Sequence, residues 1–173
     1  MTREVTGDLL ELFKKGHYDV IAHGCNCKGA MGAGIAKSIA DVYPEVRLAD
    51  KRMAEGRLKP WGGGILPVPV YDGVVINLYT QLKPGPFADM NYVAHSLRRM
   101  KDWIDNMQFE QVVRIGLPQI GCGIGDLKWK EVRGLIERTF SESRFIVDLV
   151  EYLPRQSVIS EDLNTENSII PQD

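Results

Sequence analysis

The sequence lacks a long apolar run and a marked excess of charge of either sign. No stretch approaches the roughly 20 consecutive apolar residues that a membrane-spanning helix needs, and the first ten residues, MTREVTGDLL, contain no apolar signal segment. With 21 basic and 23 acidic residues, the formal net charge is −2, which gives no electrostatic footprint for binding duplex nucleic acid. We expect a cytoplasmic protein with no membrane partner, and we expect it to be a monomer.

Cysteine is scarce, and its pattern disfavours both disulfides and zinc. The three cysteines are an odd number, and a bridge between Cys25 and Cys27 would be strained because one residue separates them. On a strand, His23, Cys25 and Cys27 would point to one side, but the sequence has no second pair at zinc-ligand spacing. We expect free thiols in a reducing compartment, no metal and no cofactor.

Apolar periodicity predicts strands that alternate with helices. Strands are expected at 3–6, 19–22, 62–70, 74–80, 112–118 and 145–153, and helices at 34–42, 44–55, 89–107 and 129–140. Asp72 and Gly73 form a turn signal between two strands, and Pro67 and Pro69 place the first of these at a sheet edge or a bulge. This order indicates an α/β fold: a three-layer α/β/α sandwich with a mixed, mostly parallel central sheet.

One domain is expected to cover residues 1–154. The chain of 173 residues is long enough for a single core, and it shows no internal repeat. Residues 155–173 are polar and lack any period, so we expect them to form a disordered tail.

Two glycine-rich loops follow predicted strands, KGAMGAGIAKSI at 28–39 and PQIGCGIGDLKW at 118–129. Glycines at such positions let the backbone approach an anion closely, with the free N–H groups directed at it. Neither loop matches the phosphate loop of P-loop NTPases or the dinucleotide-binding fingerprint. The pair therefore indicates a diphosphate held by backbone amides, and hence a nucleotide-like ligand.

Four motifs resemble the macrodomain family, a module that binds ADP-ribose. They are GDLL at 7–10, HGCN at 23–26, GAMGAGIA at 29–36 and LPQIGCGIGDLKW at 117–129. The resemblance covers about residues 1–153, and it is strongest to the branch that contains an ADP-ribose-1″-phosphate phosphatase. It implies ADP-ribose or ADP-ribose-1″-phosphate as the ligand.

The resemblance assigns roles to individual residues. It places Asp8 and the backbone of Leu9 at the adenine, Tyr152 as an aromatic stacked on that ring, and Asn26 at the distal ribose hydroxyls. It matches the first phosphate loop to Gly32, Ala33, Gly34 and Ile35, and the second to Gly121, Cys122, Gly123, Ile124 and Gly125. From the residues alone, Asp8 could equally be a turn or cap residue, Asn26 a loop-stabilising amide, and Tyr152 a core residue. Cys122 is expected to be a wall residue rather than a nucleophile.

His23 is the catalytic candidate that the resemblance implies, together with Asn26. An imidazole there could act as a base for water, as a nucleophile towards phosphorus or as a proton donor, and the sequence leaves these open. A buried structural histidine is the alternative. The implied reaction is metal-independent hydrolysis of ADP-ribose-1″-phosphate to ADP-ribose and phosphate.

A second branch of the family removes ADP-ribose from DNA or protein, and it implies a different catalytic pair, Lys83 and Asp126. Lys83 is not in register with that branch's lysine, because Thr80 and Gln81 occupy the nearest place, and Asp126 is displaced by one position. On local sequence these two residues could equally be an exposed loop lysine and a helix cap. The resemblance also disfavours removal of ADP-ribose from protein carboxylates, because the family branch with that activity has an aspartate at the position of Ala36. A non-catalytic reader of ADP-ribose is the third possibility.

Overall fold

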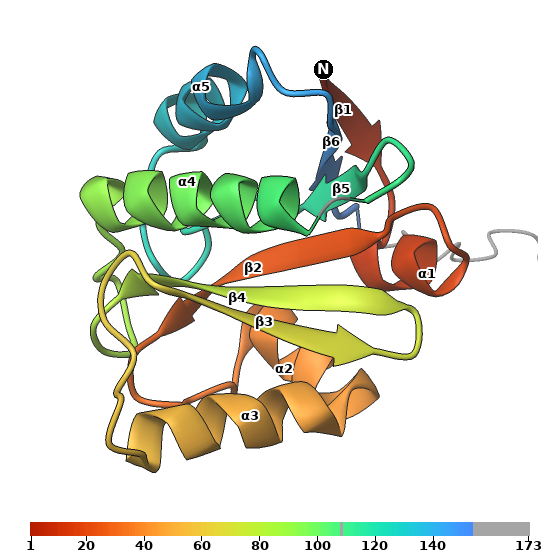
Figure 1. Cartoon of the computed structure of the whole chain (residues 1–173). Coiled ribbons are helices and arrows are strands. Elements are labelled where there is room, and N and C mark those ends of the chain that lie inside the picture. Colours follow the sequence, from red (N-terminus) through yellow and green to blue (C-terminus); the bar gives the residue numbers. More distant parts are fainter. Residues whose placement is uncertain (108, 154–173) are drawn as a thin grey trace, which may run out of the picture.

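The computed structural model describes residues 1–107 and 109–153, which form a mixed α/β structure (Figure 1). The elements are β1 (Thr2–Thr6), α1 (Leu9–Lys14), β2 (Val20–Asn26), α2 (Gly34–Val42), α3 (Pro44–Glu55), β3 (Ile65–Val70), β4 (Gly73–Gln81), α4 (Met90–Asn106), β5 (Arg114–Leu117), α5 (Trp129–Phe140) and β6 (Ile146–Glu151). The tail predicted at 155–173 lies outside the described residues.

The strands form one six-stranded sheet in the order β1-β6-β5-β2-β4-β3. All neighbours pair in parallel except β3 and β4, which form an antiparallel hairpin. Figure 1 shows α4 and α5 over one face of the sheet and α2 and α3 over the other. The three-layer architecture expected from the sequence is therefore confirmed.

The core has two parts, one on each face of the sheet. The first gathers apolar side chains of α4, α5 and one side of the strands, and the second gathers those of α1, α2, α3 and the other side. Along β2, Val20 and Ala22 enter the first part whereas Ile21 enters the second, because successive strand residues point to opposite faces. His23 follows Ile21 on the second face of the sheet.

The elements predicted from the sequence agree with the structure except at two places that bear on the site. Helix α1 was not expected; it has six residues and begins after Asp8, whose side chain caps it. Strand β2 continues to Asn26 rather than ending at residue 22, so His23 lies inside the sheet. The hairpin turn at Asp72 and Gly73 is confirmed, as is the edge position of β3. No helix among the described residues is long and apolar enough to cross a membrane.

Candidate functional site

A cleft with two adjoining lobes lies at the ends of the central strands. The first lobe has a volume of about 550 Å³ and the second about 410 Å³. Both are lined by Gly34, Ile35, Pro118 and Gln119, so the two glycine loops meet where the lobes join. Each lobe lies within the range of roughly 300–1,000 Å³ that is usual for sites of small organic ligands.

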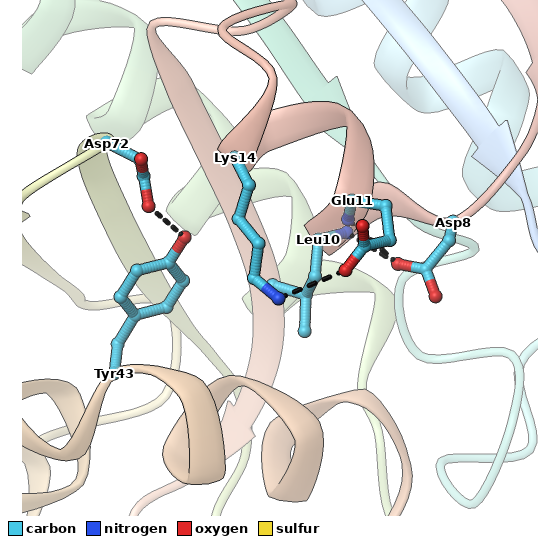
Figure 2. Close-up of polar contacts among 6 residues, drawn as sticks. All are labelled: Asp8, Leu10, Glu11, Lys14, Tyr43 and Asp72. Atoms are coloured by element: carbon cyan, nitrogen blue, oxygen red, sulfur yellow. Dashed lines mark hydrogen bonds and ion pairs between the residues drawn. The ribbon is translucent and has the colours of Figure 1, made fainter.

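The first lobe brings together Asp8, Leu9 and Tyr152. Oδ1 of Asp8 accepts hydrogen bonds from the amides of Leu10 (2.9 Å) and Glu11 (3.1 Å), which caps α1. Figure 2 shows the second carboxylate oxygen of Asp8 directed away from these amides. That oxygen accepts no hydrogen bond from the described part of the chain, so Asp8 can cap the helix and still accept a bond from a ligand. Tyr152 is 64% exposed, which makes its ring a wall of the lobe rather than a core side chain.

The first glycine loop presents free amides to the cleft. Helix α2 begins at Gly34, and its N-cap Ala33 has no side chain to bond the amides of the first turn. Gly34 has a φ of 55°, a left-handed conformation that favours glycine. A Cβ on Gly32 would meet nothing within 4 Å, so this residue is not required by packing. The open N-terminus of α2 is suited to binding an anion.

The second glycine loop is a tight turn held by its own backbone. The amides of Leu127 and Asp126 donate to the carbonyls of Gly121 (2.9 Å) and Gly123 (3.2 Å). A Cβ on Gly125 would lie 2.6 Å from the Gly121 carbonyl oxygen, whereas one on Gly123 would meet nothing within 4 Å. Gly125 is therefore required by the fold, and Gly123 is a residue whose small size keeps the second lobe open.

Asn26 lies at the end of β2 and lines the second lobe, with 8% of its surface exposed. Its Oδ1 accepts from the amide of Lys28 (2.9 Å) and its Nδ2 donates to the carbonyl of Ala30 (2.8 Å). These bonds shape the loop that leads to the first glycine loop. One Nδ2 hydrogen remains, so Asn26 can stabilise the loop and still donate to a ligand.

His23 does not line the cleft; it is fully buried in the sheet. Its Nε2 lies 2.9 Å from Oδ1 of Asn77, and because that oxygen only accepts, Nε2 carries the proton. The sulfur of Cys25 lies 3.6 Å from Nδ1 and 3.5 Å from Nε2 of the same ring. Cys25 lines the second lobe and stands between the imidazole and the cleft. Burial lowers the pKa of His23 to about 4, outweighing the hydrogen bond to Asn77, so the ring is neutral at pH 7.

The imidazole belongs to a buried polar cluster formed by His23, Asn77, Tyr79, Asp50 and Cys25. The hydroxyl of Tyr79 donates to Oδ1 of Asp50 on α3 at 2.8 Å. Burial raises the pKa of Asp50 and of the Cys25 thiol. Among the described residues, Asp50 Oδ2 and Asn77 Nδ2 are buried without a hydrogen-bond partner. The cluster fixes β2 and β4 beneath α3 and reaches the cleft through the thiol of Cys25.

Besides His23, three residues predicted for the site lie outside the lining of the cleft. Cys122 donates its thiol to the carbonyl of Ile120 (3.3 Å) and packs against the core. Nζ of Lys83 sits 4.1 Å above the ring of Phe87. Asp126 is exposed at a φ of 64° and does not cap α5, whose N-cap is Lys128. The cap alternative for Asp126 is therefore wrong, because the loop turns between Asp126 and the helix.

The structure adds lining residues that were not predicted as ligand-binding from the sequence. They are Gly24, Cys25, Thr80, Gln81, Pro84 and Gly85 in the second lobe, Ser38 and Glu151 in the first, and Pro118 and Gln119 in both. Gln81 donates Nε2 to the carbonyls of Lys83 (2.8 Å) and Gly85 (3.1 Å), which orders the loop after β4. The available signal was position, since all of these except Ser38, which lies in α2, are near or beyond the end of a strand. No group of three or more metal-ligating side chains occurs in residues 1–107 and 109–153.

Comparison with known proteins identifies relatives of two activities. No family model matches the chain. It is 29% identical over 163 residues to an uncharacterized 17.5 kDa protein of Enterobacteria phage T4, covering 89% of this chain and 98% of that protein. It is 29% identical over 143 residues to the DNA ADP-ribosyl glycohydrolase of Thermus aquaticus, covering 79% of this chain but only 37% of the relative. It is 23% identical over 170 residues to the ADP-ribose 1″-phosphate phosphatase of Saccharomyces cerevisiae, covering 83% and 95%.

Solved structures share the fold over most of the chain. The macrodomain of Thermus aquaticus DarG superposes with a TM-score of 0.74 at 25% identity, covering 87% of this chain and 98% of that one. Thermosipho africanus DarTG in complex with ADP-ribose gives a TM-score of 0.75 at 18% identity, covering 89% and 42%. With its mixed six-stranded sheet, its paired glycine loops and these relatives, the chain belongs to the macrodomain family.

Proposed function

We propose that this macrodomain binds ADP-ribose along the two lobes of the cleft. The observation that carries the proposal is the meeting of the two glycine loops at the junction of the lobes, where backbone amides can hold a diphosphate. Adenine then lies in the first lobe beside Asp8 and Tyr152. The distal ribose lies in the second lobe beside Asn26. A solved structure of the same fold is a complex with ADP-ribose, which supports the choice of this ligand.

We further propose that the cleft hydrolyses ADP-ribose-1″-phosphate. The residues that line the second lobe include no acidic or basic side chain, and three of its glycines come from the second loop. Such a lobe can stabilise the charge of a phosphoryl group through oriented amides, without a charged side chain. The leaving oxygen is an anomeric hydroxyl, which is more acidic than an ordinary alcohol and needs less help from a general acid. Water bonds to phosphorus, the bond to O1″ breaks, and the proton of water ends on the leaving oxygen.

In our proposal His23 does not contact the ligand and acts through the residues that line the cleft. Direct proton transfer requires the imidazole to reach the ligand, and Cys25 stands between them. We assign His23 as a positioning residue that holds β2 to β4 through Asn77 and so places Cys25 and Asn26 at the cleft. A positioning role predicts that His23→Gln changes ligand affinity together with stability, whereas a proton-transfer role predicts loss of turnover at unchanged affinity.

A glycohydrolase is the second candidate, favoured by the 29% identity to the DNA ADP-ribosyl glycohydrolase. Its proposed catalytic pair, Lys83 and Asp126, lies outside the lining of both lobes. Gln81 occupies the position nearest to that branch's lysine and uses its amide to order a loop. These placements support the phosphatase over the glycohydrolase. A non-catalytic reader is the outcome if the ligand binds and nothing is hydrolysed.

The test compares three substrates in parallel. The full chain is incubated with ADP-ribose-1″-phosphate, ADP-ribosylated DNA and ADP-ribosylated protein, and products are followed by mass and by phosphate release. We expect phosphate from the first substrate, loss of that activity in Asn26→Ala, and no change in Lys83→Ala or in the matched control Lys51→Ala. Release of ADP-ribose from DNA or protein that depends on Lys83 would establish the glycohydrolase instead.

A further inference from the structure

Thr80 stands at an irregularity in the sheet beside the second lobe. The pairing of β2 with β4 shifts at this point, because Cys25 pairs with Tyr79 whereas Asn26 pairs with Gln81. Thr80 is thus the extra residue of a bulge in β4. Bulges next to functional sites redirect a side chain. Here the redirected side chain is that of Thr80, which lines the second lobe.

The side chain of Thr80 occupies the space that Gly24 leaves on the neighbouring strand. A Cβ built on Gly24 would lie 2.9 Å from Oγ1 of Thr80 and 3.6 Å from its Cγ2. Gly24 lines the same lobe. The absence of a side chain at Gly24 therefore makes room for the hydroxyl of Thr80. Together the two residues form one part of the wall of the second lobe.

The backbone around Thr80 is anchored on both sides. Its carbonyl accepts from the amide of Asp89, the N-cap of α4, at 2.9 Å. The preceding Tyr79 accepts from the amide of Gly63 (2.8 Å) and donates to the carbonyl of Gly64 (3.0 Å). The hydroxyl is thus held by a rigid frame, which is what a residue that selects a ligand by geometry requires.

Thr80 is only 1% exposed, yet its hydroxyl oxygen is not one of the fully buried polar atoms that lack a partner within residues 1–107 and 109–153, and it borders the second lobe. A hydroxyl at the wall of a cleft can bond a ligand, and a ligand that leaves such a bond unmade loses about 1–3 kcal/mol. The neighbours of Thr80 in the lobe, Gly24 and Cys25, offer no strong side-chain acceptor. A partner supplied by a bound ligand accounts for this arrangement.

We propose that Thr80 is a specificity-determining residue whose hydroxyl bonds an oxygen of the distal ribose, on a hydroxyl or on its 1″ substituent. The inference rests on the proposed binding of ADP-ribose in the cleft. A hydroxyl both donates and accepts, so it suits a ribose oxygen, and it discriminates against nucleotides that end at the diphosphate. Thr80 thereby separates ADP-ribose from ADP.

Calorimetry with ADP-ribose and ADP on three proteins tests this assignment. Thr80→Val keeps the shape and removes the hydroxyl, and Thr80→Ser keeps the hydroxyl and removes the methyl group. We expect Thr80→Val to bind ADP-ribose about tenfold more weakly and to bind ADP as wild type does, since a bond of this kind contributes on the order of one power of ten. Thr80→Ser should stay close to wild type for both ligands.

Equal losses for both ligands, or no loss for either, would overturn the role of Thr80 while leaving the proposed function intact. Wild-type protein that does not bind ADP-ribose would overturn both. If Thr80→Val fails to fold, Thr80→Ala removes the same hydroxyl without adding a methyl group at its position. The affinities of Thr80→Ala for ADP-ribose and ADP then test the proposed role of Thr80 in the same way.

Discussion

Gly123 and Gly125 lie two residues apart in the second glycine loop, yet valine should affect ligand binding at the first position and the stability of the fold at the second. A Cβ on Gly123 meets nothing within 4 Å, and Gly123 lines the second lobe. A Cβ on Gly125 would lie 2.6 Å from the Gly121 carbonyl oxygen and 2.7 Å from Cβ of Ala88. The first substitution should therefore block the ligand, and the second should damage the fold.

The contacts set the size of each effect. Gly123→Val creates no clash with the protein, so the free energy of unfolding should change by less than about 0.5 kcal/mol. Its side chain enters space where the ligand's diphosphate would approach the amides, and we expect at least about a hundredfold weaker binding of ADP-ribose, roughly 2.7 kcal/mol. Gly125→Val forces backbone apart, which costs about 1–3 kcal/mol and lowers Tm by about 2–4 °C for each kcal/mol in a domain of this size.

Thermal unfolding and calorimetry with ADP-ribose, applied to both variants and to wild type, measure the two effects separately. The reasoning is refuted if Gly123→Val binds ADP-ribose with wild-type affinity, since the second loop would then not contact the ligand. It is also refuted if Gly123→Val lowers Tm as much as Gly125→Val does, because the open space at Gly123 would then be absent.

Three further predictions concern Asp8, Asn26 and His23. Asp8→Asn should keep the helix cap and the Tm but weaken binding of ADP-ribose, whereas Asp8→Ala should also lose about 1 kcal/mol of stability, as measured by denaturant unfolding. Asn26→Asp retains the acceptor for Lys28 but loses the donor to Ala30, so it should lower both Tm and ADP-ribose affinity; unchanged affinity would remove Asn26 from the site. Burial lowers the pKa of His23 from 6.5 to about 4, so the unfolded chain binds a proton at this residue before the folded chain does. The neutral imidazole therefore makes its full contribution to the free energy of unfolding above about pH 6.5. About 3 kcal/mol of that contribution is lost as the pH falls towards 4. His23→Gln should flatten the stability profile over that interval, and a profile identical to wild type would contradict the burial of the imidazole.

Much of the fold could be predicted because its helices and strands carry strong apolar periods. The predicted bounds of α2, α3 and α5 agree with the structure, since each helix buries one stripe of side chains. Helix α1 has six residues, too few to show a period, and it depends on the cap from Asp8. The end of β2 was missed because His23 and Asn26 are polar. His23 is buried in the strand beside a partner 54 positions away, Asn77, whereas Asn26 bonds its own loop at Ala30.

The sequence by itself determined the order of the elements and the two glycine loops, because both depend on residues close together in the chain. Tertiary structure alone decided which side chains reach the cleft. The pleat of β2 directs His23 and Cys25 to the same face of the sheet, and only Cys25, nearer the end of the strand, lines the cleft; the shift in register at Asn26 brings Thr80 beside Gly24. The register between two paired strands decides where each side chain lies. For β2 and β4 this register joins residues more than 50 positions apart in the sequence, so local sequence does not reveal it.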